Sequence, residues 1–178
     1  NALSFMVENE EFTSIVGPSG CGKTTILSLI AGLLEKSSGE ILLADKPIQK
    51  NDDRIGYMFQ KDHLFEWRTI WQNVTLGIEL SKPKNADEKR EFAKQLLKKY
   101  DLYDFISSKP RSLSGGMRQR VALIRTLVME PSLLLLDEPF SALDFQTRLK
   151  VCDDVYSIIK SEKKTAILVT HDISEAIS

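Results

Sequence analysis

Two kinds of hydrophobic pattern alternate along the chain. Runs of mostly apolar residues indicate β-strands, which we expect at residues 12–16, 40–44, 54–59, 133–136 and 166–169. Stretches in which apolar residues recur every three or four positions indicate helices at residues 23–34, 71–103, 114–129 and 145–161. Strands that alternate with helices are typical of an α/β domain with a largely parallel central sheet. Because Asp45, Lys46 and Pro47 favour a tight turn between two strands, part of the β-structure should be antiparallel.

The middle of the chain is charged and predominantly helical. A loop at residues 81–85, which contains Pro83, should interrupt the first helical stretch. Ser114 is a good N-cap for the next helix, and Pro131 follows its end. We therefore expect a single domain over residues 1–178, in which core segments 3–70 and 130–178 flank a helical subdomain inserted at about residues 71–129.

Composition narrows the possible functions. The 178 residues, 42% of them hydrophobic, suffice for one compact domain. The net charge of -1 provides no general attraction for nucleic acid, which we do not expect as a partner. No stretch approaches the roughly 18 consecutive apolar residues of a membrane span. The two cysteines, Cys21 and Cys152, lack metal-ligand spacing and suit a reducing compartment.

A glycine-rich segment joins the first predicted strand to the first predicted helix. It fits the P-loop pattern, in which two glycines separated by four residues precede a lysine and a serine or threonine. It reads Gly17-Pro18-Ser19-Gly20-Cys21-Gly22-Lys23-Thr24. Glycines let the backbone N–H groups turn toward a phosphate, and the helix N-terminus adds partial positive charge. We expect Lys23 to reach the β- and γ-phosphates of a nucleotide and the Thr24 hydroxyl to bind Mg²⁺. A glycine-rich turn without ligand is the alternative.

Two acidic residues follow the buried strand at residues 133–136. Asp137 should lie at the carboxyl end of this strand, where ligands of open α/β sheets bind, and so near the Mg²⁺ ion. Glu138 points differently and suits a second role, the activation of the water that attacks the γ-phosphate. The alternative is a solvated turn that caps a helix.

One segment carries a family resemblance. It reads Leu113-Ser114-Gly115-Gly116-Met117-Arg118-Gln119-Arg120, lies between the P-loop and Asp137, and resembles the signature motif of ABC ATPases. A serine cap and two glycines at a helix N-terminus give a second possible anion site. The resemblance implies a P-loop NTPase fold and a head-to-tail dimer, in which the signature of one copy covers the ATP on the P-loop of the other.

Shorter segments match further motifs of the same family, in the expected order. Gln60 resembles the Q-loop glutamine, residues 141–144 resemble the D-loop, which ends at Asp144, and His171 resembles the switch histidine. The resemblance implies ATP and Mg²⁺ as cofactors. It assigns catalysis to Glu138, His171 and Gln60, and metal binding to Thr24, Gln60 and Asp137. It assigns nucleotide binding to the P-loop and Thr25, to Ser114, Gly115 and Gly116, and to Asp144.

The segment at residues 61–74 is similar to importers of the nitrate, sulfonate and taurine type. The resemblance implies a location at the cytoplasmic face of the membrane, bound to a permease, and a solute-binding protein in the same system. Phe65 and Trp67 could line the groove that receives the permease, since aromatic anchors dominate such contacts. Packing inside the helical subdomain is equally open for these aromatic residues, and Trp71 suits it best.

Three expectations concern the limits of the resemblance. Only 22 residues precede Lys23, so the aromatic residue that stacks on adenine in known members should lie outside this chain. We also expect the chain to be truncated at both ends. Few residues precede Lys23, and the chain stops at Ser178, just after His171 starts the next helix. Non-transport ABC ATPases, of the translation-factor or DNA-maintenance type, are the alternative class. The DNA-maintenance type inserts a long coiled coil or zinc module between P-loop and signature, which is absent here.

Overall fold

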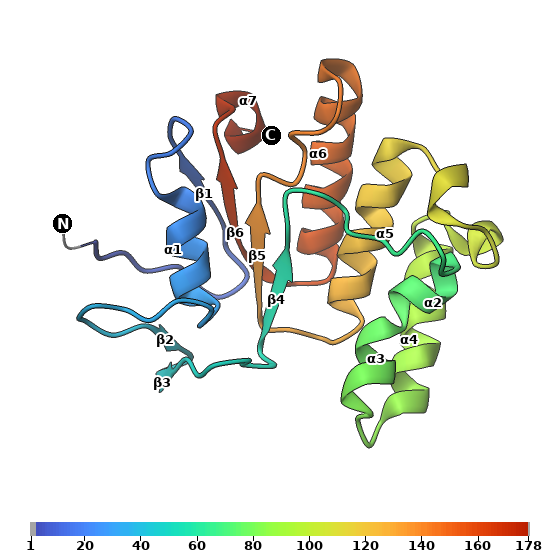
Figure 1. The fold of residues 1–178 in the computed structure, drawn as a ribbon, viewed down its shortest axis with the longest axis horizontal. Helices are drawn as coiled ribbons and strands as arrows, with labels where there is room; N and C mark the ends of the chain where they lie inside the picture. Colours follow the sequence, from blue (N-terminus) through green and yellow to red (C-terminus); the bar gives the residue numbers. More distant parts are fainter. Residues whose placement is uncertain (1–2, 178) are drawn as a thin grey trace.

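A four-stranded parallel sheet forms the centre of the computed structural model, which describes residues 3–177 (Figure 1). The other three residues of the predicted domain, 1, 2 and 178, lie outside the described part. The sheet order is β1-β6-β5-β4, and the strands are β1 (Phe12–Val16), β4 (Ile55–Met58), β5 (Leu133–Asp137) and β6 (Thr165–Thr170). All three strand pairs are parallel, which confirms the predicted α/β class. Because parallel strands point the same way, their carboxyl ends share one edge of the sheet.

The two central strands are buried on both faces. Leu133 and Leu135 of β5 pack with helix α1 (Lys23–Ile30) on one face. Leu134 and Leu136 pack on the other face, against helices α5 (Gly115–Leu127) and α6 (Phe145–Ser161). Alternate residues of a strand point to opposite faces, so a run of four leucines is what a doubly covered strand needs.

The antiparallel part is a separate two-stranded sheet rather than part of the central one. It consists of β2 (Leu42–Leu43) and β3 (Lys46–Pro47), which are shorter than the strand predicted at residues 40–44. The predicted first helix is also shorter than expected, because the chain turns at Gly32 with a φ of 67°. A Cβ atom at residue 32 would lie 2.9 Å from the carbonyl oxygen of Gln49, so this close approach favours glycine.

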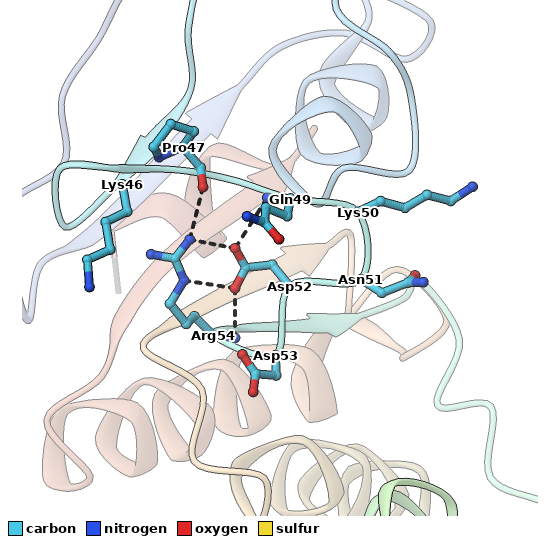
Figure 2. Close-up of a pocket in the computed structure, with 8 residues that line it drawn as sticks. All are labelled: Lys46, Pro47, Gln49, Lys50, Asn51, Asp52, Asp53 and Arg54. Carbon is cyan, nitrogen blue, oxygen red and sulfur yellow. Dashed lines mark hydrogen bonds and ion pairs between the residues drawn. The ribbon is translucent and has the colours of Figure 1, made fainter.

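Arg54 ties the small sheet to the start of β4 (Figure 2). Its guanidinium donates to the carbonyl oxygens of Leu43 at 2.9 Å and Pro47 at 3.3 Å, and its Nε donates to Asp52 Oδ1 at 2.8 Å. The hydrogen bonds from Arg54 hold the pKa of Asp52 well below its usual range. Pro47, Asp52 and Arg54 line an open cavity of about 570 Å³ at the amino end of β4.

A group of helices covers the far side of α5 from the sheet (Figure 1). They are α2 (Ile70–Val74), α3 (Leu76–Ser81) and α4 (Ala86–Lys99), followed by the 3₁₀ turns η1 (Tyr103–Phe105) and η2 (Pro110–Ser112). Thr69 and Gln72 form a capping box that starts α2. The last helix, α7 (Ile173–Ile177), follows β6. The division into core segments and an inserted helical subdomain stays a prediction. No helix within residues 3–177 is long and apolar enough to cross a membrane.

Candidate functional site

The P-loop lies between β1 and α1, at the carboxyl edge of the sheet. Gly20 and Gly22 have φ values of 81° and 100°, which other residues adopt only with strain. Gly22 is the N-cap of α1 and has no side chain to bond the first-turn N–H groups of the helix. These groups, on Lys23, Thr24 and Thr25, therefore suit an anion bound at the helix N-terminus.

The Lys23 ammonium lies inside this loop. The side chain is 5% exposed, and its Nζ donates to the carbonyl oxygens of Gly17 at 2.8 Å and Pro18 at 2.9 Å. The same nitrogen lies 3.6 Å from Oε1 of Glu138, the residue after β5. The structure therefore brings the predicted phosphate-binding cation next to the predicted water-activating carboxylate.

Asp137 joins α1 to the end of β5. Its Oδ1 accepts a hydrogen bond from the Thr24 hydroxyl at 2.9 Å, and its Oδ2 accepts one from the Tyr57 hydroxyl at 3.1 Å. Burial, with the negative charge of Asp137, raises the pKa of Tyr57 well above its usual range, so Tyr57 acts as a donor at neutral pH. Sequence reasoning missed Tyr57. The only signal was a polar hydroxyl in an apolar strand that neighbours β5.

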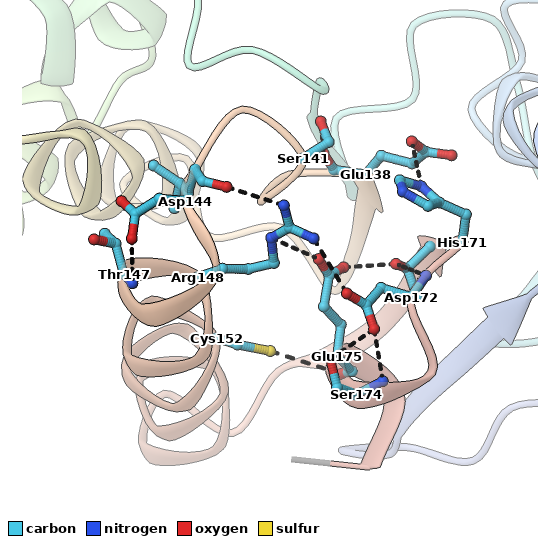
Figure 3. A network of polar contacts seen from close by, with 12 residues as sticks. Glu138, Ser141, Asp144, Thr147, Arg148, Cys152, His171, Asp172, Ser174 and Glu175 are labelled. Carbon is cyan, nitrogen blue, oxygen red and sulfur yellow. Dashed lines mark hydrogen bonds and ion pairs between the residues drawn. The ribbon is translucent and has the colours of Figure 1, made fainter.

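Glu138 and His171 meet across the ends of β5 and β6. Nδ1 of His171 lies 3.0 Å from Oε2 of Glu138 (Figure 3). Glu138 has a φ of 45°, a strained conformation for a residue with a side chain, and such strain is common at functional sites. Gln60 follows β4 and is exposed at the same edge of the sheet. The P-loop, Gln60, the acidic pair and His171 therefore all lie at the carboxyl ends of the four strands of the central sheet.

The predicted signature residues start α5, and Ser114 is its N-cap, as expected. The Ser114 hydroxyl accepts a hydrogen bond from the N–H of Met117 at 3.3 Å. A Cβ atom on Gly115 would lie 2.7 Å from Cδ2 of Leu143, and one on Gly116 would lie 2.5 Å from Cγ2 of Val151. The two glycines thus permit close packing against the D-loop segment and α6, which the sequence did not indicate. Within residues 3–177, no hydrogen bond or ion pair joins residues 114–116 to residues 17–25.

Asp144 caps helix α6 in the structure. Its carboxylate accepts a hydrogen bond from the N–H of Thr147 at 3.1 Å. Hydrogen bonds from the side chain and backbone of Thr147 hold the pKa of Asp144 below its usual range. The predicted nucleotide-binding role of Asp144 stays a prediction.

The three aromatic residues near α2 differ in exposure. Trp67 is 72% exposed, and its ring packs against that of Phe65 with a centroid distance of 4.8 Å and an interplanar angle of 33°. Trp71 is partly buried and packs against the main core, as the sequence favoured. Asn73, fully buried, donates to the carbonyl oxygens of Phe65 at 3.1 Å and Thr69 at 2.9 Å, and so holds the loop that presents Trp67.

Comparison with known proteins supports the same reading. Residues 1–141 match the family described as "ABC transporter". The chain belongs to this ABC transporter family. It is 51% identical over 176 residues to an uncharacterized ABC transporter ATP-binding protein, YtlC, of Bacillus subtilis. The alignment covers 99% of this chain and 67% of that protein. It is 42% identical over 175 residues to the aliphatic sulfonates import ATP-binding protein SsuB of Bacillus thuringiensis, covering 98% of this chain and 68% of SsuB.

A solved structure also shares the fold. It is that of CbiO1 from Clostridium perfringens, part of the ABC transporter complex cbiONQ, with a TM-score of 0.85 and 32% identity over 96% of this chain and 71% of that one. The chain spans about two thirds of the length of the curated relatives it matches. As an ABC ATPase domain, it belongs to a family of ATP-binding domains that hydrolyse ATP.

The residues of this ABC ATPase fit Mg²⁺. Two neighbouring ligands of an octahedral Mg²⁺ ion with bonds of about 2.1 Å lie about 3 Å apart. The Thr24 and Asp137 oxygens are 2.9 Å apart, which matches that spacing. Within the described part of the chain, no group of three or more histidine, cysteine, aspartate or glutamate side chains could hold a metal.

Proposed function

We propose that this domain binds MgATP on its P-loop and hydrolyses it with Glu138 as the general base. The single observation that carries the proposal is the placement of the Glu138 carboxylate, 3.6 Å from Lys23 Nζ and 3.0 Å from His171 Nδ1. A cation that suits phosphate oxygens and a base that can take a proton thus share one edge of the sheet. Their proximity is what in-line attack by water on a γ-phosphate requires.

Each side chain has a separate task in this proposal. Lys23 leaves the carbonyl oxygens of the loop and binds the β- and γ-phosphates, while first-turn N–H groups of α1 hold the remaining oxygens. Thr24 and Asp137 hold Mg²⁺, which when bound neutralises charge on the phosphates. Glu138 accepts a proton from the attacking water, His171 orients Glu138 and contacts the γ-phosphate, and Gln60 contacts the metal or the water.

The proposal includes a second copy of the domain. Ser114, Gly115 and Gly116 form the N-terminus of α5. Gly115 lines a cavity of about 210 Å³ together with Lys61, Asp62 and Leu143. This end of α5 makes no hydrogen bond or ion pair with the P-loop of its own chain within residues 3–177. We place it, with Asp144, over the nucleotide of the other copy in a head-to-tail dimer.

Cysteine alkylation tests nucleotide binding independently of turnover. Cys21 is an exposed P-loop residue, whereas Cys152 is buried and serves as an internal reference. We expect brief maleimide treatment of the complete protein to label Cys21 first. Saturating MgATP should slow that labelling at least about tenfold, because alkylation needs access to the thiol. Mass spectrometry of the modified peptides gives both rates.

AMP with Mg²⁺ is the matched control, because it retains adenine, ribose and the α-phosphate but lacks the β- and γ-phosphates that Lys23 is proposed to bind. It should leave the labelling rate of Cys21 unchanged. Equal labelling of Cys21 with and without saturating MgATP contradicts the proposed site.

We further propose that the domain drives solute import from the cytoplasmic face of a membrane, bound to a permease and served by a solute-binding protein. The similarity to the aliphatic sulfonates import protein SsuB supports import. The resemblance of residues 61–74 supports a solute of the nitrate, sulfonate or taurine type. The exposed Trp67 and its neighbour Phe65 are the proposed anchors for the permease. This surface directly precedes α2, the first helix of the predicted helical subdomain at about residues 71–129.

Replacing Trp67 by serine in the assembled transporter tests the anchor. Trp67 is 72% exposed, so the fold and the ATPase activity of the isolated protein should not change. Loss of an aromatic anchor costs about 2 kcal/mol or more, roughly a 30-fold weaker grip on the permease. Affinity for the permease in detergent or nanodiscs measures the loss.

Leu80→Ser provides the matched control, since Leu80 is an apolar residue of α3 with 73% exposure. It should leave permease affinity within about twofold, as expected for a surface change outside an interface. Equal effects of the two substitutions contradict the anchor role of Trp67.

A further inference from the structure

One arginine joins the D-loop segment to the segment that carries His171. Arg148 (Figure 3) lies in the first turn of α6. Its Nη2 donates to the carbonyl oxygen of Leu143 at 2.9 Å. Its Nη1 donates to Oδ2 of Asp172, the residue directly after His171, at 3.1 Å. A single planar group therefore contacts both loops at once, which suits the fork geometry of a guanidinium.

Asp172 is held from its other side as well. Its Oδ1 accepts hydrogen bonds from the N–H and hydroxyl of Ser174, at 2.9 and 2.6 Å, and its own N–H donates to the hydroxyl of Thr170 at 3.0 Å. That hydroxyl donates to Oε2 of Glu175 at 2.6 Å. The backbone on both sides of His171 is thus fixed by a network that ends on Arg148.

The charges of the network are buried to different extents. Burial raises the pKa of Glu175, whose side chain is 2% exposed, whereas hydrogen bonds from Ser174 lower the pKa of Asp172. The guanidinium of Arg148 faces both carboxylates, with Nε 3.8 Å from Oε1 of Glu175. That Nε is buried and has no hydrogen-bond partner. The guanidinium nevertheless interacts with both carboxylates of the segment that follows β6.

The His171 ring depends on this backbone for its position. Its side chain is 41% exposed. Its Nδ1 lies 3.0 Å from Oε2 of Glu138, which follows a different strand, β5. With little packing around the ring, the location of residues 170–172 decides where it lies. Misplacement of a reacting group by about 1 Å can cost roughly 100-fold in rate.

We propose that Arg148 is a positioning residue that sets His171 against Glu138 and keeps the D-loop segment in register with that pair. The inference rests on the proposed function of Glu138 and His171. Arg148 touches neither nucleotide nor water in this scheme, and acts through Asp172 on one side and Leu143 on the other. Hydrolysis is then sensitive to the D-loop, which in the proposed dimer faces the second copy.

The test is Arg148→Lys in the complete protein. Lysine keeps the charge but cannot hold the Leu143 carbonyl and Asp172 together. We expect kcat to fall at least about tenfold, with the KM for ATP within about twofold, since a positioning change acts on the transition state more than on binding. The imidazole ¹⁵N and ¹H resonances of His171 should shift or broaden. Those of His63, the other of the two histidines, should not.

Arg54→Lys is the matched control. Arg54 also bridges two backbone carbonyls and a carboxylate, but at the amino end of β4, away from the P-loop edge (Figure 2). It should lower the melting temperature comparably and leave kcat and the His171 resonances unchanged. Asp172→Asn, which keeps an acceptor for Ser174 but weakens the pair with Arg148, is the second variant and should reproduce the fall in kcat.

Three outcomes overturn the inference. Equal losses of kcat in Arg148→Lys and Arg54→Lys assign Arg148 to general stability. Normal kcat with unchanged His171 resonances means that Arg148 does not position the ring. Normal kcat with shifted His171 resonances means that the ring moves without consequence, and this outcome also removes the proposed role of His171 in hydrolysis.

Discussion

Replacing Glu138 by glutamine should lower ATP turnover by about 10²- to 10⁴-fold, the usual contribution of a general base. Glutamine keeps the size and hydrogen bonding of the side chain but cannot accept a proton from water. Lys23, Thr24 and Asp137 remain to hold MgATP, so binding should persist. Turnover and nucleotide affinity measured on one preparation separate the two steps.

Glu130→Gln is the matched control for this substitution. Glu130 also has a left-handed backbone, with a φ of 58° against 45° for Glu138, and also pairs with a buried lysine. It lies at the end of α5, away from the P-loop edge. Its substitution should leave turnover within about twofold, as expected for a change outside the site. Similar losses in the two variants contradict the role of Glu138.

The Glu138→Gln variant should also trap the head-to-tail dimer when ATP is saturating. Adding Ser114→Arg should dissolve the dimer, because a long cation at the N-cap of α5 conflicts with the partial positive charge of the helix end and with the close surface of a partner. Size-exclusion chromatography with and without MgATP measures both effects. A Glu138→Gln protein that stays monomeric, or a dimer that Ser114→Arg does not affect, contradicts the composite site.

Local signals explain what the sequence alone could predict. The strand at residues 12–16 and the helix at residues 145–161 have the predicted bounds, because strand-like and helical periodicity each persist over a whole element. The P-loop geometry follows from Gly20 and Gly22, whose positive φ values need glycine. Ser114 caps α5 because a serine hydroxyl is a favoured acceptor for first-turn N–H groups.

Contacts between distant residues explain what the sequence alone could not predict. Tyr57 bonds Asp137 across 80 positions, and only the register of β4 against β5 brings them together. The end of α1 depends on the approach of Gln49 to Gly32, a tertiary contact that overrides helical periodicity. Gly116 is matched to Val151 of α6 in the same way. These partners follow from packing, which no local pattern specifies.

Lys23→Ala should lower turnover by about 10²- to 10³-fold, the loss typical of removing one electrostatic contact to a transition state. The Lys23 side chain is 5% exposed, and its Nζ lies 3.6 Å from the Glu138 carboxylate. Among the described residues, the only other group that pairs with this carboxylate is the imidazole of His171. Affinity for MgATP should fall about tenfold, which corresponds to about 1.4 kcal/mol. Calorimetry for binding and a coupled assay for turnover measure the two losses.

Lys89→Ala separates this effect from the general cost of removing a buried lysine. Lys89 is 8% exposed and donates to the carbonyl oxygen of Met129 at 3.2 Å and to Glu130 at 2.7 Å, so it has the same kinds of partner as Lys23. Its loss should lower stability by about 1 kcal/mol, because it removes the hydrogen bonds to Met129 and Glu130. Turnover per folded molecule should not change, since Lys89 joins α4 to the end of α5 and lies outside the P-loop. A folded Lys23→Ala protein with near-normal turnover contradicts the assignment, because the phosphates must then be held without the cation that the loop encloses.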